Sequence, residues 1–540
     1  MGWTTHAVTN QVPDLADYNL YAADTALQEA VAREGAQAAA PALSAYGREL
    51  GRARIIALAA EMDRAVPQLR AYDRQGRRTD DVVMHAGWHE FLHMGMAQGL
   101  HAPASVARAA AFLLHGQIEA CTLCPLTMTS AAHVILARES WAEVLRVPLS
   151  GLEYDRADRP ATEKRSMLIG MGLTEKQGGS DLRGTSTRAV RAEGDSGGYR
   201  LVGHKWFMSV PGADAHLVLA QLDGAPTCFY VPRWAPDGER NGVRVMQLKD
   251  KLGNRANASA EVEFHDAWGR LVAEPGRGIA TLAEMAGYTR LDCALGSTAL
   301  MRAALVQAMH HARHRLAFGR SLIRHALMRS VLADLALETE AAVALGLRLA
   351  RAVGLGEAGT AFDRALARIV TPAAKFWVCK RAITMVAEAM EALGGNGYVE
   401  TYPLARLYRE APVNSIWEGS GNVMCLDVLR AVKKHPDLTQ ALFDRLRAEA
   451  GGGDLLKRIA ALQNQLQQPA EELEAAARKV AADLVVLVQA VLLHRHAPPL
   501  VADAFLYSRL AAGARLGVAG MAVPAAYHAT LLERAWGGEV

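Results

Sequence analysis

The sequence predicts an α+β protein in which a β-domain lies between helical regions. Three observations indicate this class: alanine- and leucine-rich segments with helical spacing in both halves of the chain, short β-prone runs between residues 166 and 276, and clusters of turn residues between those runs. A chain of 540 residues also exceeds what one hydrophobic core usually organises, so several domains are expected.

Residues 1–165 are predicted to form an N-terminal helical domain. Between Ala22 and Leu149, Ala, Leu, Arg and Glu recur at helical spacing, with breaks near Pro41, Pro67 and Pro103. This pattern favours a bundle of helices.

Residues 166–276 are predicted to form the β-domain. The runs YRLVGHKWFMSV, HLVLAQL, TCFYVPRW and VRVMQL are β-prone, and the turn clusters GDSGG and APDGERNG separate strands of this kind.

The helical pattern returns after residue 276. Residues 277–435 are predicted to form a helical bundle from long amphipathic segments, and residues 436–540 a C-terminal helical extension. The extension places apolar side chains at helical spacing and then a more apolar helix near residues 484–493, which is too short to span a bilayer. The spaced side chains are Leu455, Ile459, Leu462 and Leu466.

Composition and charge are those of an ordinary globular protein. About half of the residues are hydrophobic, a fifth are charged, and the formal net charge is +3, which predicts no partner. The first residues show no secretory signal, so a cytoplasmic protein is expected. Of the six cysteines only Cys121 and Cys124 are close in sequence, and a reduced structural pair is favoured over a metal or redox site.

The stretch HEFLH, from His89 to His93, matches the zinc-peptidase pattern H-E-x-x-H. No third ligand suggests itself nearby, and His85, His89 and His93 at four-residue spacing also describe one helix face. We therefore expect no metal site here.

Three further stretches carry candidate chemistry. In TEKQGGSD, Thr174 and Ser180 offer hydroxyls and Gly179 permits close backbone approach, although a plain polar turn would have the same composition. In GHKWFMSV, Phe207 and Ser209 could give a flat ring a wall and a hydroxyl, although aromatic residues in strands usually belong to the core. In IWEGSGN, Glu418 lies in apolar surroundings that should raise its pKa and make it a base near neutral pH.

Together and in this order, these stretches resemble the acyl-CoA dehydrogenase family of flavoproteins. TEKQGGSD is similar to its flavin loop, WFMS to its aromatic strand, RLAFG to its R-x-x-F-G segment and IWEGSGN to its base motif. The resemblance covers Ala22 to Val432, and the C-terminal extension resembles the adaptive alkylation-response branch of that family.

The resemblance implies FAD as the cofactor and Glu418 as the base that removes the α-proton of an acyl-CoA. It also implies that the base's own main-chain N–H stabilises the developing enolate. Thr289, where some members carry the base, cannot serve. The cofactor-binding residues implied are Thr174, Gly179, Ser180, Phe207, Met208, Ser209, Arg315, Ile416, Trp417, Gly419, Ser420, Gly421 and Asn422.

Three departures from the family pattern affect activity and cofactor sharing. Glu391 replaces a glutamine that meets the flavin diphosphate across a subunit interface, and Ala326 after His325 removes another contact. Trp417 replaces a tyrosine and adds bulk beside the base. We expect weak dehydrogenation of short or branched acyl-CoA. The resemblance implies that the chain forms a homotetramer, passes electrons to an electron-transfer flavoprotein and does not bind a membrane.

The resemblance also implies electrostatic, non-specific binding of double-stranded DNA in the response to DNA alkylation. No acidic residue occurs between Asp292 and Asp334, and six arginines do, although these side chains could equally bind flavin phosphate or cover a helix face. The alternative is a conventional acyl-CoA dehydrogenase of fatty-acid or branched-chain catabolism without DNA binding. The arginines are Arg302, Arg313, Arg315, Arg320, Arg324 and Arg329.

Overall fold

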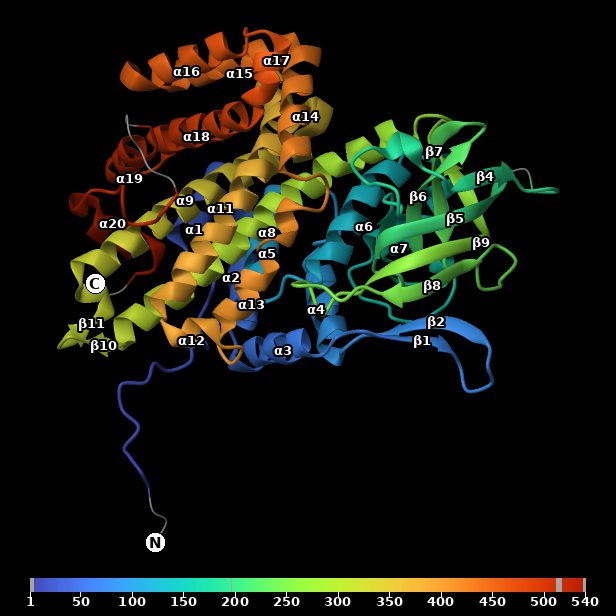
Figure 1. Ribbon diagram of the computed structural model, residues 1–540, viewed down its shortest axis with the longest axis horizontal. Coiled ribbons are helices and arrows are strands. Elements are labelled where there is room, and N and C mark those ends of the chain that lie inside the picture. Colours follow the sequence, from blue (N-terminus) through green and yellow to red (C-terminus); the bar gives the residue numbers. More distant parts are fainter. Residues whose placement is uncertain (1–3, 196, 511–516, 538–540) are drawn as a thin grey trace. The chain divides into compact units, whose positions relative to one another are not determined.

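The computed structural model describes residues 4–195, 197–510 and 517–537 (Figure 1). Its residues pack into two compact units. The β-unit consists of Ala57–Phe112 and Glu119–Asp292, and the helical unit of Met1–Ile56, Leu113–Ile118 and Cys293–Val540. The four domain ranges expected from the sequence stay a prediction.

The β-unit contains a seven-stranded sheet that closes on itself (Figure 1). Strands β3 and β4 run parallel to β6, the other pairings are antiparallel, and the pairing of β6 with β7 completes the ring. All four predicted β-prone runs are strands. The strands are β3 (Ile169–Gly172), β4 (Arg188–Arg191), β5 (Gly198–Ser209), β6 (Ala215–Leu222), β7 (Ala225–Pro232), β8 (Val243–Leu248) and β9 (Ser259–Val272).

Apolar side chains from these strands fill the interior of the sheet. Tyr199, Leu201 and Met208 of β5 pack with Phe229 of β7 and Phe264 of β9, and all five are nearly or fully buried. Because successive side chains of a strand point to opposite faces, Phe207 lies on the outer face beside the buried Met208.

The remaining part of the β-unit is mainly helical, with one hairpin that the sequence did not predict. Strands β1 (Gln68–Tyr72) and β2 (Arg78–Val83) pair across a turn in which Asp73 accepts hydrogen bonds from the N–H groups of Gln75 and Arg77. The expectation of helices alone across this region is wrong here, because polar turn chemistry outweighed the helical spacing. The helices are α4 (Ala86–Ala97), α5 (Val106–Ile118, shared with the helical unit), α6 (Leu123–Leu136) and α7 (Arg146–Ser150).

The helical unit packs long helices around a shared apolar core. Helix α9 (Ala326–Leu355) contacts α1 (Thr25–Arg33) and α11 (Thr371–Ala392), and it is buried along most of its length. A short hairpin, β10 (Leu316–Ala317) with β11 (Arg320–Ser321), follows α8 (Gly278–His314). The other helices here are α2 (Ala40–Leu50), α10 (Ala361–Ala365), α12 (Gly395–Tyr398), α13 (Pro403–Glu410) and α14 (Gly421–Lys434); α3 (Ala53–Arg64) and α8 each continue into the β-unit.

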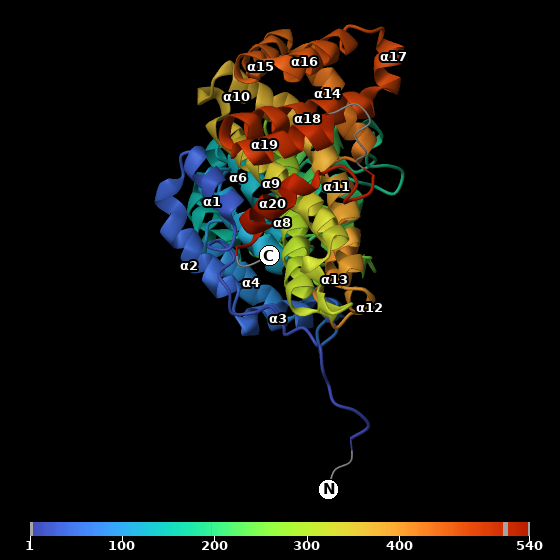
Figure 2. The ribbon, with the colours of Figure 1, turned by 90° about the vertical axis from the view of Figure 1, so that its left-hand side faces the viewer.

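The C-terminal extension is helical, as predicted, and belongs to the helical unit. Figure 2 shows α15 (Pro436–Glu449) and α16 (Gly453–Gln465) beside α18 (Ala477–His496), which packs on α9, α11 and α14. Leu455, Ile459 and Leu462 are buried, as the spacing predicted, whereas Leu466 follows the end of α16 and is half-buried. Within the described residues, no helix is long and apolar enough to cross a membrane. The remaining helices are α17 (Ala470–Ala475), α19 (Pro499–Phe505) and α20 (Ala525–Ala535).

Candidate active site

The site residues predicted from the sequence lie in both units. In the β-unit they lie on the loop after β3 and at the end of β5: Thr174, Gly179, Ser180, Phe207, Met208 and Ser209. In the helical unit, Arg315 directly follows α8, Ile416, Trp417, Glu418, Gly419 and Ser420 precede α14, and Gly421 and Asn422 are the first residues of α14.

The loop after β3 is organised by Glu175, which is almost fully buried. Its carboxylate accepts hydrogen bonds from the main-chain and hydroxyl groups of Ser186 and Thr187, and from the Lys205 ammonium at 2.7 Å. Burial alone would raise the pKa of Glu175, but the Lys205 charge and these hydrogen bonds hold it well below its ordinary value. Burial lowers the pKa of Lys205 to about 8 against the opposing effect of Glu175, so the pair is ionised at neutral pH.

This arrangement fixes the backbone on either side of Glu175. The Thr174 carbonyl accepts a hydrogen bond from the Trp206 N–H at 2.8 Å, which joins the loop to β5. Gly179 folds back closely on Thr174, and a Cβ at Gly179 would lie 2.7 Å from the Thr174 Oγ1. Gly179 and Ser180 are exposed. The loop therefore presents backbone and hydroxyl groups at the surface of the β-unit.

The end of β5 presents one aromatic side chain outward. Phe207 is 52% exposed, whereas the Met208 side chain is fully buried in the sheet core. Ser209 is half-buried, and its hydroxyl lies 3.0 Å from that of Ser259. The Phe207 ring is exposed, with the Lys249 ammonium 4.9 Å from its centroid, and Met208 has only its main chain to offer a ligand.

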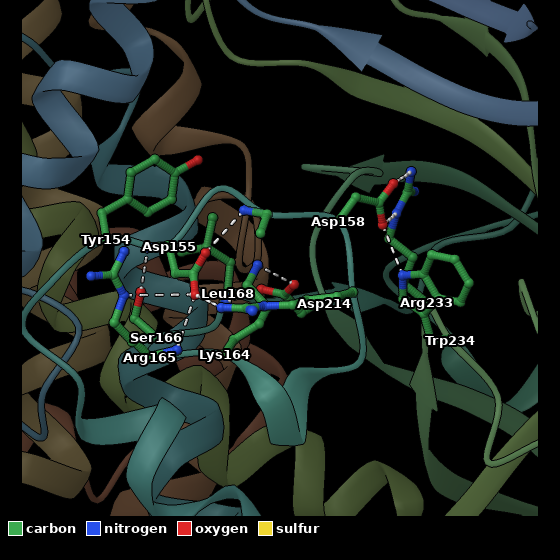
Figure 3. A network of polar contacts seen from close by, with 12 residues as sticks. Tyr154, Asp155, Asp158, Lys164, Arg165, Ser166, Leu168, Asp214, Arg233 and Trp234 are labelled. Carbon is green, nitrogen blue, oxygen red and sulfur yellow. Dashed lines mark hydrogen bonds and ion pairs between the residues drawn. The ribbon is translucent and has the colours of Figure 1, made fainter. Parts of the chain in front are cut away.

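The segment that leads into β3 is anchored by buried carboxylates (Figure 3). Asp155 accepts hydrogen bonds from the Arg165 main chain and the Arg159 guanidinium, and Asp214 accepts them from Lys164 at 2.6 Å and from the Leu168 N–H at 2.8 Å. These contacts fix the position of the start of β3. The Glu175 loop follows the other end of this strand.

In the helical unit, Glu418 lies on a tight turn between residues 413–415 and α14. Its φ of +59° is in the left-handed region, which non-glycine residues rarely adopt, and Gly419 follows with φ of +105°. The carbonyls on both sides, of Trp417 and Gly419, accept hydrogen bonds from the Lys375 ammonium, the first at 2.8 Å. Glu418 is half-buried, so part of the residue is exposed to solvent.

Helix α14 begins directly after this turn. Ser420 is its N-terminal cap residue and Gly421 its first residue, so the free N–H groups of a helix start follow the base. A Cβ at Gly421 would lie 3.3 Å from the Phe376 ring. The side-chain oxygen of Asn422 accepts a hydrogen bond from Arg478 of the C-terminal extension at 3.2 Å. Such a helix start suits an anionic group.

The flanking residues of the turn have defined positions. Ile416 is 64% exposed, and the Trp417 indole N–H donates to the Asn414 side chain at 3.1 Å. Arg315 lies beside the β10–β11 hairpin and donates to the Asn10 carbonyl. Glu391 is exposed near the end of α11, and the His325 ring lies 3.0 Å from the Ala317 carbonyl.

The arginine-rich stretch is partly committed to internal contacts. Arg302 is buried and pairs with Asp24, and Arg313 donates to the Trp536 carbonyl and lies over the Trp536 ring. Arg320 and Arg324 are exposed, and within the described chain neither forms an ion pair with a carboxylate. In this stretch, Arg302 and Arg313 are held by contacts within the protein, whereas Arg320 and Arg324 are exposed to solvent.

Two histidines of the HEFLH region, His85 and His89, have structural partners, and His93 is exposed. The His85 ring caps α4 by accepting from the Gly87 N–H, and the His89 ring lies 3.0 Å from the Tyr154 hydroxyl. Burial lowers the pKa of His89 to about 4. Among residues 4–195, 197–510 and 517–537, no group of three or more His, Cys, Asp or Glu side chains is placed to hold a metal. The six cysteines are buried and free.

Three residues that organise these sites were not singled out in the sequence. Lys205 precedes the quoted aromatic pair, Lys375 is the lone charge in PAAKFWVC, and Arg478 belongs to the extension. A lysine within an apolar run was the available signal for the first two, because such a charge must find buried acceptors.

Residues 170–267 match the acyl-CoA dehydrogenase middle domain, and residues 276–433 match the acyl-CoA dehydrogenase C-terminal domain. Residues 10–156 match the adaptive response protein AidB N-terminal domain. The chain belongs to the acyl-CoA dehydrogenase family and is an FAD-dependent oxidoreductase of that family.

Within this family, the chain is 48% identical over 522 residues to the putative acyl-CoA dehydrogenase AidB of Escherichia coli (strain K12), covering 94% of each chain. It is 30% identical over 408 residues to acyl-CoA dehydrogenase family member 11 of Caenorhabditis elegans, covering 71% of this chain and 65% of that one. The apo form of Bd2924 has a similar structure, with a TM-score of 0.81 and 28% identity over 90% of this chain and all of that chain. These likenesses confirm the predicted family and branch.

The residues present fit FAD. The exposed Phe207 ring offers a wall for a planar group, and the start of α14 offers N–H groups to a diphosphate. Gly419 places no side chain beside Glu418, and Gly421 is buried against the Phe376 ring.

Proposed function

We propose that the protein is an AidB-like flavoprotein that slowly dehydrogenates short or branched acyl-CoA thioesters and binds double-stranded DNA in the response to DNA alkylation. The observation that carries the enzymatic part is the Glu418 turn, because it presents a half-buried carboxylate from a backbone fixed on both sides. A base needs this combination of access and fixed geometry.

In the proposed reaction, Glu418 accepts the α-proton of the acyl thioester. FAD, when bound, supplies the acceptor for the hydride that leaves the β-carbon. The α-proton of a thioester is weakly acidic, so negative charge on the thioester oxygen must be stabilised, and the main-chain N–H of Glu418 is the group assigned to it. The unusual backbone conformation of Glu418 supports this double role of side chain and main chain.

Weak activity is proposed because of Trp417. Its indole is tied to Asn414, so its bulk stays beside the base, where it limits the space for an acyl chain. Slow turnover of short substrates and slower turnover of branched ones are expected. Electrons would then pass to an electron-transfer flavoprotein.

Glu418→Gln tests the enzymatic proposal. Anaerobic reduction of the bound flavin by a short acyl-CoA should slow by about 10²- to 10⁴-fold, because the amide cannot take the proton. Flavin content and reduction by dithionite should not change. Glu474→Gln, at an exposed position on α17, is the matched control. A wild-type flavin that no acyl-CoA reduces, or a Gln variant as fast as wild type, would refute the proposal.

The DNA-binding part is supported by likeness to the adaptive-response branch and by the exposed cations Arg320 and Arg324. Many other arginines are committed to internal pairs. Arg509 pairs with Asp334 and Glu338, and Arg534 with Glu29 and Glu340. The C-terminal extension also carries basic residues, of which Arg515 lies outside the described residues. A small cationic surface predicts modest affinity and non-specific binding.

A salt titration of DNA binding tests this part. Affinity for duplex DNA should fall at least about tenfold as salt rises from low to physiological concentration, because condensed counterions are released on binding. Replacing Arg320 and Arg324 by Ala should weaken binding and flatten the salt dependence. Lys457→Ala, which removes a cation already paired with Asp454, is the control. No binding at low ionic strength would remove the DNA role.

We also propose a cytoplasmic homotetramer, as the likeness to the family implies and as free cysteines suit a reducing compartment. The alternative function is a conventional acyl-CoA dehydrogenase without DNA binding. The internal pairing of the buried Arg302 and Arg509 and of the half-buried Arg534 favours it, because guanidiniums held by internal carboxylates are not available to phosphates. The salt titration separates the two functions.

A further inference from the structure

Lys375 is a fully buried lysine in the first half of α11. A buried ammonium loses its hydration, and only close acceptors offset this cost. Thr371 and Cys379, one turn before and one turn after it on α11, are also buried, so the Lys375 side chain lies on a face that is covered by protein. The role of Lys375 therefore follows from the hydrogen-bond acceptors of its ammonium group.

The Lys375 ammonium donates to two main-chain carbonyls, those of Trp417 and Gly419, the first at 2.8 Å. Within the described part of the chain it forms no ion pair with a carboxylate. The two acceptors are the residues on either side of Glu418. One ammonium thus holds both peptide groups that border the base.

The backbone between these two carbonyls needs such support. Glu418 has φ of +59° and Gly419 has φ of +105°. A non-glycine residue in the left-handed region is strained, and this conformation persists only where the surroundings determine it. Gly421, two residues beyond this turn, lies against Phe376, the residue next to Lys375 on α11. The turn is therefore attached to one rigid helix at its carbonyls and at its end.

We propose that Lys375 is the positioning residue for Glu418: by binding the carbonyls of Trp417 and Gly419 it fixes the carboxylate and the main-chain N–H of Glu418 for proton removal. This inference rests on the proposed function of Glu418 as base. It assigns Lys375 no contact with substrate and no part in proton transfer.

Lys375→Met tests the inference, with Lys433→Met, which removes an exposed cation from α14, as the control for charge. The limiting rate of flavin reduction by a short acyl-CoA should fall about 10- to 100-fold, because a small displacement of a base is costly. The acyl-CoA concentration for half-maximal rate and the flavin content should stay within about twofold. Equal rates in a folded, flavin-loaded Lys375→Met variant would overturn the proposal.

A second measurement does not depend on catalysis. A glutamate-specific protease should cut after Glu418 more rapidly in Lys375→Met than in wild type or Lys433→Met, with the site identified by mass spectrometry. Faster cleavage together with a wild-type flavin that acyl-CoA never reduces would refute the proposed function and leave the hold on the turn established. Unchanged cleavage would overturn the inference. If Lys375→Met gives no folded protein, Lys375→Gln is measured in the same way, and failure of both to fold would assign Lys375 to stability alone and overturn it.

Discussion

Two loops of this protein are each held by a fully buried lysine, and they use its charge differently. In the β-unit, Lys205 lies 2.7 Å from the Glu175 carboxylate, which in turn holds Ser186 and Thr187. In the helical unit, Lys375 binds two main-chain carbonyls around Glu418. The first loop depends on an ion pair, whereas the second depends on the attraction between one charge and two peptide dipoles.

Because of this difference, the two loops should tolerate different changes. A buried ion pair fails when either partner loses its charge, because the remaining charge stays unpaired in the interior. A charge bound to carbonyls has no acidic partner to lose. The Glu175 loop should therefore respond strongly to mutation and to acid, and the Glu418 turn should respond mainly to changes in backbone shape.

Lys205→Met is the change with the largest expected effect. It leaves the Glu175 carboxylate buried without its cation, which should destabilise the protein by about 3–5 kcal/mol. Urea unfolding, monitored by the release of the flavin, measures this loss of stability. The double variant Lys205→Met with Glu175→Gln removes both charges and should recover more than half of it. A single variant as stable as wild type would show that the ion pair does not organise the loop.

Acid should weaken the same loop. The folded pKa of Glu175 is held well below the ordinary value of about 4.5, so its stabilising contribution is full above that pH and is lost as pH falls below it. The melting temperature of wild type should therefore fall more steeply below pH 4.5 than that of Glu175→Gln. Parallel curves for the two proteins would mean that other carboxylates govern acid unfolding.

The sequence predicted the fold well where the physical pattern was long. The strands of the β-domain and the amphipathic helix with Leu455, Ile459 and Leu462 are confirmed, because alternation and helical spacing over many residues leave few alternatives. The β1–β2 hairpin was missed. Its turn depends on Asp73 and a few local hydrogen bonds, which a spacing argument over a longer window does not detect.

Sequence motifs were enough to locate the candidate site residues, but not the buried lysines that hold their loops. Phe207 lies on an outer strand face and Glu418 in a half-buried turn, and their roles as flavin wall and base stay predictions. Met208 was expected to line the ring, and its buried side chain follows from strand alternation. Lys205 and Lys375 bind partners 30 and 42–44 residues away, so no local pattern could have paired them.

Gly419→Ala probes the backbone of the second loop. At φ of +105° an alanine is strained, and its Cβ would also meet the end of the Met424 side chain. We expect a loss of about 1–3 kcal/mol and flavin reduction by acyl-CoA about tenfold slower. Gly178→Ala is the control in the first loop, since its nearest contact would be 3.8 Å away. Equal effects of the two changes would remove the contrast between a strained turn and a charge-held loop.

Trp417→Tyr has the smallest expected effect and tests whether the Trp417 side chain limits the space beside Glu418 or supports the turn. Tyrosine is smaller than tryptophan, and it loses the indole hydrogen bond to Asn414, which costs about 0.5–1.5 kcal/mol. Because Lys375 binds the carbonyl of residue 417 and not its side chain, the turn should keep its shape. Flavin reduction should therefore become about threefold faster for branched acyl-CoA and change less for short unbranched ones, a difference of roughly 0.7 kcal/mol. If both substrates slow instead, the indole supports the turn, and bulk beside the base does not limit the acyl chain.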